Sequence, residues 1–367
     1  MKKVRRAAGH LRDMKPYDPK YLPARVYLNA SESPYGMPAK AREEFMRMIA
    51  SEPIHRYPDP LAKELRKAVA INQGLAPECI MLGNGGDELI FNLCLAYGGR
   101  NRSLLIAPPT FSSYQTDALL TYTTLIEVPR QLNVTSEGML DYSVSEEAIL
   151  ECVSSASNDL IMLASPNNPT GECLSLNFIN ELLAATNAVV LIDQAYIDFS
   201  DSKYDATLLL EYHTNLAILR TFSKAYGLAG LRLGYLAANT EIISELGKVR
   251  QPYSVNTVSA LAGLAVLAED QEVQRSVKNI ISERERLTSL VGPQGLGLPV
   301  SQSEANFILI QVPQAAAVWQ KLYDEYGILV RDLSAVKGLT DCLRVSIGTP
   351  EENDEFVQAF SKILKRS

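Results

Sequence analysis

The sequence predicts an α/β fold in which a mostly parallel sheet lies between helices in a large domain, followed by a smaller α+β domain. The chain has 367 residues, and a single hydrophobic core rarely grows beyond about 250–300 residues. Between residues 104 and 219, short apolar runs alternate with helical stretches, a pattern typical of βαβ units. These runs are mostly apolar throughout, as expected of strands that helices cover on both faces.

The elements follow from local patterns along the chain. Residues 1 to about 44 carry prolines at positions 16, 19, 23, 34 and 38, too many for a helix, and predict an extended arm. Helices are expected where apolar residues recur at helical spacing, at 39–50, 61–72, 88–97, 241–250, 257–290 and 351–365. Strands are expected at 104–107, 124–128, 160–164, 189–192 and 216–219. From about residue 300 a β–α–β–α alternation predicts the smaller domain.

Composition and charge narrow the class of protein. Hydrophobic residues make up 47% of the chain, charged residues 21%, and the formal net charge is −7. An acidic chain gives no support to nucleic-acid binding, which usually shows as a basic surface. No apolar run approaches the length of a membrane span. We therefore expect neither nucleic acid nor membrane as a partner.

Cysteines, histidines and the first residues bear on location and metal binding. Five cysteines without CxxC spacing predict reduced thiols in a cytoplasmic protein. Three histidines far apart offer little for a metal site or a histidine-based triad. The basic segment 1–6 lacks the apolar stretch of a secretory signal. A mitochondrial presequence stays open because no acidic residue precedes Asp13.

Residues 220–232 (RTFSKAYGLAGLR) follow an expected strand and are the centre of the functional interpretation. Lys224 lies between the hydroxyls of Thr221 and Ser223 and the guanidinium of Arg232. An amine can bond covalently to an aldehyde, and hydroxyls with a guanidinium can hold a phosphate. The pattern suits a phosphorylated aldehyde. The alternative is a solvated lysine and a structural arginine in a loop.

Two further segments follow expected strands. Residues 188–196 (AVVLIDQAY) place Asp193 at a strand end, and ligands of open α/β sheets bind at that carboxyl edge. Pyridoxal phosphate needs such a carboxylate against its ring nitrogen, although Asp193 could instead cap the next helix. Residues 165–171 (SPNNPTG) follow the strand expected at 160–164, and their proline and glycine content alone would indicate an ordinary loop.

Residues 83–88 (GNGGDE) form a glycine-rich loop before an expected helix. Backbone N–H groups and the positive end of the helix dipole suit a phosphate at such a place. The loop does not match the dinucleotide fingerprint GxGxxG, because Glu88 occupies the place of the third glycine. It is a candidate wall of a phosphate site.

These segments, in this order, resemble the aspartate-aminotransferase superfamily of pyridoxal-phosphate-dependent enzymes, of fold type I. Further matches run through nearly the whole chain and make it most similar to the histidinol-phosphate aminotransferases. They are 28–36 (LNASESPYG), 56–60 (RYPDP), 251–253 (QPY), 303–307 (SEANF) and 343–349 (LRVSIGT). The resemblance implies a seven-stranded type of sheet and three parts: an N-terminal arm with a small-domain segment (1–44), a large cofactor-binding domain (45–245), and a connecting long helix with a small C-terminal domain (246–367).

The resemblance also assigns roles around pyridoxal phosphate. Lys224 binds the cofactor through its amine and then moves a proton at the substrate Cα. Asp193 pairs with the ring nitrogen, Asn168 and Tyr196 donate to the phenolic oxygen, and Tyr114 stacks on the ring. The implied phosphate ligands are the amides of Gly86 and Asp87, the hydroxyls of Thr221 and Ser223, Arg232, and Tyr57 of the partner subunit. A homodimer with shared active sites follows from this resemblance.

The same resemblance implies substrate contacts. Arg344 matches the arginine that binds an α-carboxylate. Arg331, Tyr17 and Tyr253 match positions that bind the substrate phosphate in the histidinol-phosphate enzymes. The alternative is that Arg331 pairs with a neighbouring aspartate, Asp332 or Asp324, and that the two tyrosines only pack. Two residues depart from the family pattern: Gln194 replaces a usual glutamate, and Ser33 a frequent asparagine.

The expected function is amino transfer from L-histidinol phosphate to 2-oxoglutarate, a step of histidine biosynthesis. Aromatic aminotransferases acting on phenylalanine or tyrosine, and decarboxylases of phosphorylated threonine, share nearly the same motifs and stay open as alternatives. A cofactor-binding regulatory protein without turnover is the alternative from another class. It predicts the loss of Lys224 or Asp193, and both are present.

Overall fold

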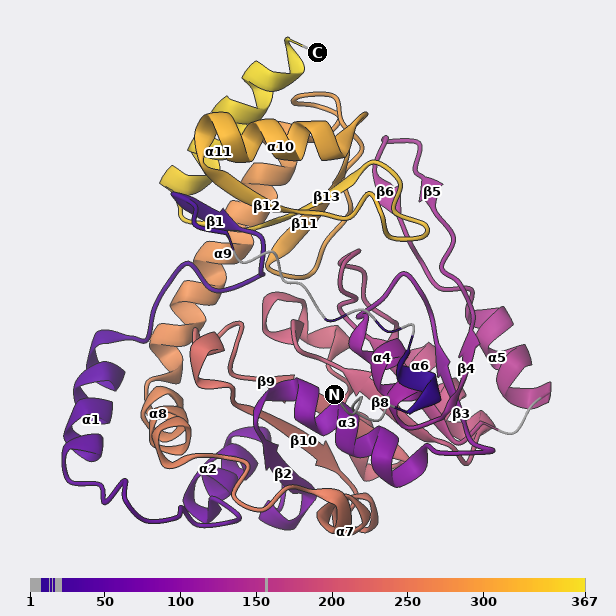
Figure 1. Cartoon of the computed structure of the whole chain (residues 1–367), viewed down its shortest axis with the longest axis vertical. Coiled ribbons are helices and arrows are strands. Elements are labelled where there is room, and N and C mark those ends of the chain that lie inside the picture. Colours follow the sequence, from indigo (N-terminus) through magenta and orange to yellow (C-terminus); the bar gives the residue numbers. More distant parts are fainter. Residues whose placement is uncertain (1–7, 13, 15, 17–21, 156–157, 367) are drawn as a thin grey trace, which may run out of the picture.

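The computed structural model contains a seven-stranded sheet, a four-stranded sheet and a two-stranded ladder, β5 (Asn133–Val134) with β6 (Leu140–Asp141). It describes residues 8–12, 14, 16, 22–155 and 158–366. Figure 1 shows the larger sheet and its helices in the lower part of the molecule and the smaller sheet above them. The long helix α9 (Asp270–Val291) runs between these two parts.

The large sheet has the strand order β2-β10-β9-β8-β7-β3-β4. All neighbouring pairs from β9 to β4 are parallel, whereas β10 is antiparallel to both of its neighbours. The strands are β2 (Ile80–Gly83), β3 (Ser103–Ile106), β4 (Thr124–Glu127), β7 (Leu160–Ala164), β8 (Val189–Asp193), β9 (Leu216–Thr221) and β10 (Gly234–Ala238). The predicted α/β class with a mostly parallel sheet is confirmed.

Alternate residues of the central strands face two different helix layers. Leu104, Ile106, Leu160 and Met162 pack in one cluster with side chains of α3 (Gly85–Tyr97), α4 (Ser113–Leu120) and α7 (Thr240–Val249). Their neighbours, such as Leu105 and Ile161, pack in a second cluster with α5 (Glu146–Ser155) and α6 (Leu176–Ala185). Since both faces are covered, every residue of β7 and β8 is buried.

Two strands of this sheet were not predicted. The four residues of β2 precede the glycine loop, and β10 begins with a glycine and ends with two alanines. Glycine and alanine are poor strand formers, so local propensity does not indicate β10. The β2 segment is apolar (IMLG) but only four residues long, so it was not recognised as a strand. These segments become strands through pairing with their neighbours: Gly234 of β10 aligns with Thr221 of β9 on one side and with Gly83 of β2 on the other.

The expectation of one continuous helix over 257–290 is wrong, since the structure has α8 (Thr257–Ala268) followed by α9. Glu269 separates them with φ −111° and ψ 32°, outside helical geometry. Acidic residues Asp270 and Glu272 occupy the first turn of α9, where they interact favourably with the helix dipole. Helix α8 packs on α1 (Ala39–Ala50) and α2 (Lys63–Gln73), whereas α9 continues towards the smaller sheet.

The smaller sheet has the order β1-β12-β13-β11. Its elements are β1 (Val26–Leu28), β11 (Phe307–Gln311), α10 (Ala315–Tyr326), β12 (Ile328–Asp332), β13 (Cys342–Ser346) and α11 (Pro350–Leu364). The N-terminal strand β1 pairs in parallel with β12, about three hundred residues later in the chain. Helix α1 continues through residues 44 and 45, so the exact domain boundaries stay a prediction.

No helix in the described ranges has both the length and the apolar character that crossing a bilayer requires. All five cysteines carry free thiols.

Candidate active site

A cavity of about 480 Å³ is lined by residues of the large sheet's carboxyl edge and of the smaller sheet. Most of the residues predicted for cofactor and substrate binding line it. They are Gly86, Asp87, Asn168, Asp193, Tyr196, Thr221, Ser223, Lys224, Arg232, Arg331 and Arg344. Segments from different parts of the sequence therefore meet at one place, as the motifs predicted.

Strand register explains why the large-sheet residues meet. Asp193 is the last residue of β8, and it aligns with Ala164 at the end of β7 and with Leu219 near the end of β9. Parallel strands deliver their carboxyl ends to one edge, where the following loops turn away. The loops after β7, β8 and β9 carry Asn168, Tyr196 and Lys224 into the same cavity.

Asp193 is almost fully buried, with 6% of its surface exposed. Its Oδ1 accepts a hydrogen bond from the Ala195 N–H at 3.0 Å, and its Oδ2 accepts one from the Tyr114 hydroxyl at 2.6 Å. Burial raises the pKa of Asp193 to about 6, although both hydrogen bonds act in the opposite direction. A buried carboxylate that is expensive to keep charged suits a cationic ring nitrogen as its partner.

Lys224 lies in the turn that follows β9. Its Nζ donates to the Ala30 carbonyl at 3.1 Å and lies 5.4 Å from the centre of the Tyr196 ring. Gly227 closes the turn with φ +65°, and a Cβ there would lie 2.8 Å from the Tyr35 carbonyl oxygen. Only glycine fits this close approach without displacing the N-terminal segment, which fixes the lysine beside the cavity.

The start of α3 and Arg232 line the cavity at the place where the sequence predicts a phosphate. A Cβ on Gly85 would lie 2.8 Å from Arg232 Nη2, so the absence of a side chain brings the guanidinium against the helix. The first N–H groups of a helix have no partners within it and favour an anion. Arg232 Nη2 also contacts Asp87 Oδ2 at 2.9 Å.

Together these features fit pyridoxal phosphate. The helix start and Arg232 can hold its phosphate, with the hydroxyls of Thr221 and Ser223 lining the same end. Asp193 can pair with the ring nitrogen, and Lys224 can bond to the aldehyde.

The stacking role expected of Tyr114 is corrected by its position. Tyr114 has no exposed surface and does not line the cavity, since its hydroxyl is directed to Asp193. Phe111 lines the cavity instead, and its ring meets that of Tyr114 edge-on at 5.7 Å. The physical reason is that Phe111 lies in the turn after β3, at the sheet edge, whereas Tyr114 lies within α4 and points into the core.

On the side of the smaller sheet, Arg344 and Arg331 are direct cross-strand partners on β13 and β12. Like charges placed opposite each other in a sheet are destabilising, and both residues line the cavity. Arg344 donates to Asn168 Oδ1 at 2.5 Å and to the Asn29 carbonyl at 2.8 Å. Two arginines on adjacent strands that line the same cavity suit an anionic ligand.

Two predicted tyrosines that the structure describes do not line this cavity in the single chain. Tyr57 and Tyr253 stack on each other with ring centres 4.7 Å apart, and 83% and 42% of their surfaces are exposed. Neither lines the cavity. Tyr17 lies outside the described residues.

The two residues that depart from the family pattern, Gln194 and Ser33, both make hydrogen bonds within the chain. Gln194 has no exposed surface; it donates to the Tyr204 carbonyl at 3.0 Å and accepts from Arg220 at 3.3 Å. Arg220 already has a carboxylate partner in Asp205 at 2.6 Å. The neutral Gln194 amide therefore gives Arg220 a further acceptor without adding a second negative charge. The Ser33 hydroxyl accepts the Tyr35 N–H at 3.2 Å.

The sequence interpretation missed several residues of the cavity. Phe111 was overlooked although it directly follows the Pro-Pro-Thr turn after an expected strand, which is the signal that could have found it. Tyr27, Leu333 and Val336 add an apolar wall near Arg331. No local pattern marks these three, because β1 and β12 come together only in the fold.

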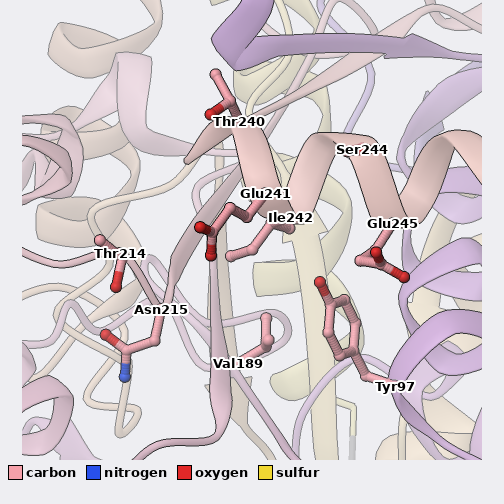
Figure 2. Close-up of a pocket in the computed structure, with 9 residues that line it drawn as sticks. All are labelled: Tyr97, Val189, Thr214, Asn215, Thr240, Glu241, Ile242, Ser244 and Glu245. Carbon is pink, nitrogen blue, oxygen red and sulfur yellow. The ribbon is translucent and has the colours of Figure 1, made fainter.

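A second hollow, of about 540 Å³, is lined by residues at the opposite, amino edge of the sheet. Figure 2 shows Glu241, Glu245 and Tyr97 around it, with Asn215 at one end. The Asn215 amide already donates to three backbone carbonyls, those of Leu183, Thr186 and Ala188. This hollow holds none of the predicted site residues, and its carboxylates would repel an anionic substrate.

Comparisons with known proteins agree with the geometry. The family model described as aminotransferase class I and II matches residues 25–360. The chain is 40% identical to histidinol-phosphate aminotransferase 1 of Carboxydothermus hydrogenoformans, over 96% of both chains. It is 35% identical to the histidinol-phosphate aminotransferase of Chlorobium chlorochromatii, over 93% of this chain and 91% of that protein.

Solved structures show the same fold. The histidinol-phosphate aminotransferase of Sinorhizobium meliloti, solved in complex with pyridoxal-5'-phosphate, superposes with a TM-score of 0.87 over 99% of both chains at 21% identity. The L-threonine-O-3-phosphate decarboxylase of Porphyromonas gingivalis gives 0.74 over 93% of this chain and 99% of that chain, at 24% identity. At these identities the two structures establish the fold alone.

Proposed function

The chain belongs to the class I and II aminotransferases, and from this premise we propose that it transfers the amino group of L-histidinol phosphate to 2-oxoglutarate. The products are imidazole acetol phosphate and glutamate, in histidine biosynthesis. The enzyme depends on pyridoxal phosphate. Its similarity to histidinol-phosphate aminotransferases over nearly the full chain supports the choice of substrate.

The observation that carries this proposal is that Arg331 and Arg344 are cross-strand partners and both line the cavity. Histidinol phosphate has a phosphate and no carboxylate, whereas glutamate has two carboxylates. A site that uses both substrates in turn needs cations that accept either group. Two arginines on adjacent strands supply this, because a guanidinium binds carboxylate and phosphate alike through paired N–H donors.

The residues of the cavity have distinct tasks. When bound, pyridoxal phosphate supplies an aldehyde that takes the amino group and a ring that withdraws electrons from the substrate Cα. With the cofactor bound, the Lys224 amine would take the proton from the substrate Cα and return it to the carbon of the cofactor's aldehyde group. The negative charge of Asp193 keeps the ring nitrogen protonated, while Asn168 and Tyr196 hold the phenolic oxygen. The start of α3 and Arg232 anchor the phosphate.

We propose that the enzyme is a homodimer with shared active sites. Tyr57 and Tyr253 support this, since both are expected at an active site and yet project from the surface of a single chain. Aromatic residues are enriched at protein–protein interfaces. In the proposed dimer, the partner subunit's Tyr57 reaches the cofactor phosphate. The free thiols support a cytoplasmic location, also as a proposal.

An aromatic aminotransferase is the second candidate. Leu329, Leu333, Val336 and Tyr27 form an apolar surface beside the arginines, which would accommodate a phenyl ring with its carboxylate on Arg344. The same surface accommodates the imidazole ring of histidinol phosphate. The apolar wall alone therefore does not separate the two substrates.

A half-reaction separates them directly. The purified holoenzyme is mixed with histidinol phosphate, and separately with phenylalanine, without any keto acid, and the visible absorbance of the bound cofactor is followed. Faster loss of absorbance with histidinol phosphate is expected. Faster loss with phenylalanine would move the enzyme to the aromatic aminotransferases. No loss with either would overturn both substrates.

A further inference from the structure

We infer that Tyr114 is a positioning residue whose buried hydroxyl fixes the carboxylate of Asp193 for the cofactor ring nitrogen. This rests on the enzyme's dependence on pyridoxal phosphate and not on which amino donor it uses. Tyr114 itself does not line the cavity. Its effect is therefore expected to pass through Asp193 and through its contact with Phe111.

The two oxygens of Asp193 have separate donors from separate elements. Oδ1 accepts from the N–H of Ala195, two residues further along the same segment, at 3.0 Å. Oδ2 accepts from the hydroxyl of Tyr114 at 2.6 Å, and Tyr114 belongs to α4 in the helix layer beneath the sheet. The first contact is local and leaves the carboxylate free to tilt with its own loop. The second ties the carboxylate to a different element and so fixes its orientation.

Tyr114 is built to remain a hydrogen-bond donor. Burial, followed by the charge of Asp193, raises its pKa well above 10, so the phenol keeps its proton throughout the working range of pH. The nearby guanidinium of Arg130 does not compete for the carboxylate, because it donates to the carbonyls of Ala107 at 3.2 Å and Tyr142 at 3.1 Å. The ring of Tyr114 packs in the apolar cluster that includes Ile90.

Other charged groups face Asp193 from the surrounding elements. Asp87 at the start of α3 raises its pKa, and Lys224 after β9 lowers it. Tyr196 follows β8 and interacts with Tyr114. Burial is the largest influence on Asp193, and the Tyr114 hydrogen bond is the largest influence that opposes it. Without this bond the pKa of Asp193 would rise further, and more of the carboxyl group would be in the neutral form, which cannot stabilise a protonated ring nitrogen.

The same side chain also contacts the residue expected to cover the face of the cofactor ring. Phe111 meets Tyr114 edge-on at 5.7 Å, and the Tyr114 N–H donates to the Phe111 carbonyl at 3.3 Å. Tyr114 thus couples two contacts of the cofactor ring, one at its face and one at its nitrogen. The position of Tyr114 in the first turn of α4 makes both contacts, to Asp193 and to Phe111, possible.

Replacing the hydroxyl alone tests this inference. For Tyr114→Phe, the affinity of the apoprotein for pyridoxal phosphate is measured by equilibrium dialysis between pH 5.5 and 8.5. We expect binding about ten- to a hundredfold weaker at pH 7, the effect of losing a hydrogen bond to a charged group. The pH at which affinity falls should move upward relative to the parent protein. The cofactor's own phosphate titrates equally with both proteins and cancels in the comparison.

Tyr142→Phe is the matched control. Tyr142 is equally buried, but its hydroxyl faces the Cys342 sulfur at 3.8 Å and not the cavity. Its removal should leave cofactor affinity within about twofold, since no contact to the site is lost. An equal loss in both variants would show a general effect of removing a buried hydroxyl, and would overturn the inference.

A double-mutant cycle with Asp193→Asn separates positioning from packing. Tyr114→Phe should weaken cofactor binding strongly in the parent protein and by less than about threefold in the Asp193→Asn background. Equal losses in both backgrounds would assign Tyr114 a merely structural role. If cofactor binding is too weak to measure, the same cycle is followed by the apoprotein's thermal unfolding at pH 8. A coupling there supports the inference, and strict additivity overturns it.

Discussion

The two halves of the cavity are assembled in different ways. The cofactor half comes from one sheet edge, where β7, β8 and β9 end together and α3 begins. The substrate half comes from the smaller sheet, with Arg331 and Arg344 on strands whose neighbour is the N-terminal β1. Two expected members of the substrate and phosphate contacts, Tyr57 and Tyr253, lie outside the cavity of one chain.

This difference suggests that the reaction and the choice of substrate depend on different parts of the fold. Strand register brings the ends of β7, β8 and β9 together, and the loops that follow carry Asn168 and Lys224 beside Asp193. The buried sheet therefore preorganises the groups expected to do the chemistry. Substrate choice depends on segments that meet only through tertiary contacts, and in the proposed dimer through a second subunit. Substitutions in the first half should therefore remove the reaction, and those in the second should change its specificity.

The largest effect is expected from Lys224→Ala, which removes the amine that moves the proton. Turnover should fall by at least about a thousandfold. The apoprotein should stay folded, because among the described residues the substitution removes one side-chain hydrogen bond, to the Ala30 carbonyl, and the contact with the Tyr196 ring. Steady-state assays and circular dichroism measure the two properties. Substantial transamination by this variant would contradict the role of Lys224 and with it the division between the halves.

Arg331→Ala should lower kcat/KM for histidinol phosphate by about a hundredfold, since it removes one charged ligand of the phosphate. The loss for phenylalanine should stay within about threefold. Arg366→Ala serves as the control, because Arg366 lies at the exposed end of the chain with Glu325. Equal losses for both donors would show that the second half of the cavity does not recognise the phosphate.

Tyr57→Phe should weaken binding of pyridoxal phosphate by about tenfold, because it removes one hydroxyl donor to the phosphate. In mixed dimers, a Tyr57→Phe subunit combined with a Lys224→Ala subunit has one site that keeps Lys224 and receives an intact Tyr57. That site should bind the cofactor like the parent enzyme. If only the weak affinity is found, the hydroxyl does not act across the subunit boundary.

The smallest effect concerns stability. Asp193 has a pKa of about 6 in the fold and about 3.9 in an unfolded chain. Because the pKa is raised in the fold, the free energy of unfolding of the apoprotein falls as pH rises from about 3.9 to about 6. Above about pH 6 this loss of stability is complete. Asp193→Asn should therefore stabilise the apoprotein at pH 8 by about 1–2 kcal/mol, the full shift being about 3 kcal/mol before lost hydrogen bonding.

The gain should largely disappear at pH 4, where the carboxyl group is neutral in the fold and only about half ionised in the unfolded chain. Thermal or urea unfolding of the cofactor-free proteins at pH 4 and pH 8 measures it. A gain that is the same at both pH values would mean that it arises from packing and not from the buried charge. Either way the variant should lose transamination, as is typical when a functional site is relieved of its strain.

Much of the cofactor half was predictable because its residues follow directly from strands. The apolar runs before Asp193 and Lys224 were recognised, and both residues line the cavity. Tyr114 was expected to stack on the face of the cofactor ring, whereas the structure buries it behind the cavity with its hydroxyl on Asp193. One turn of α4 carries Tyr114 into the core, while Phe111 stays at the sheet edge, and no sequence period distinguishes these two positions.

Fewer features of the proposed substrate half were predictable from the sequence, and two strands of the large sheet were missed. Strands β2 and β10 consist of short or small-residue segments that gain their structure by pairing with each other and with β9. The opposition of Arg331 and Arg344 arises from the register of β12 against β13. The break at Glu269 between α8 and α9 was missed because each side of it has a helical pattern.

By itself the sequence determined the α/β class, the order of the central strands along the chain, and the chemical groups that each strand delivers to its end. These depend on hydrophobic burial and local turns, which are properties of short segments. Only the tertiary structure decided which donor each oxygen of Asp193 receives, which aromatic ring reaches the cavity, and which arginines stand together. Those relations depend on register and on the packing of helices against the sheet, where a shift of one residue turns a side chain from the cavity to the core.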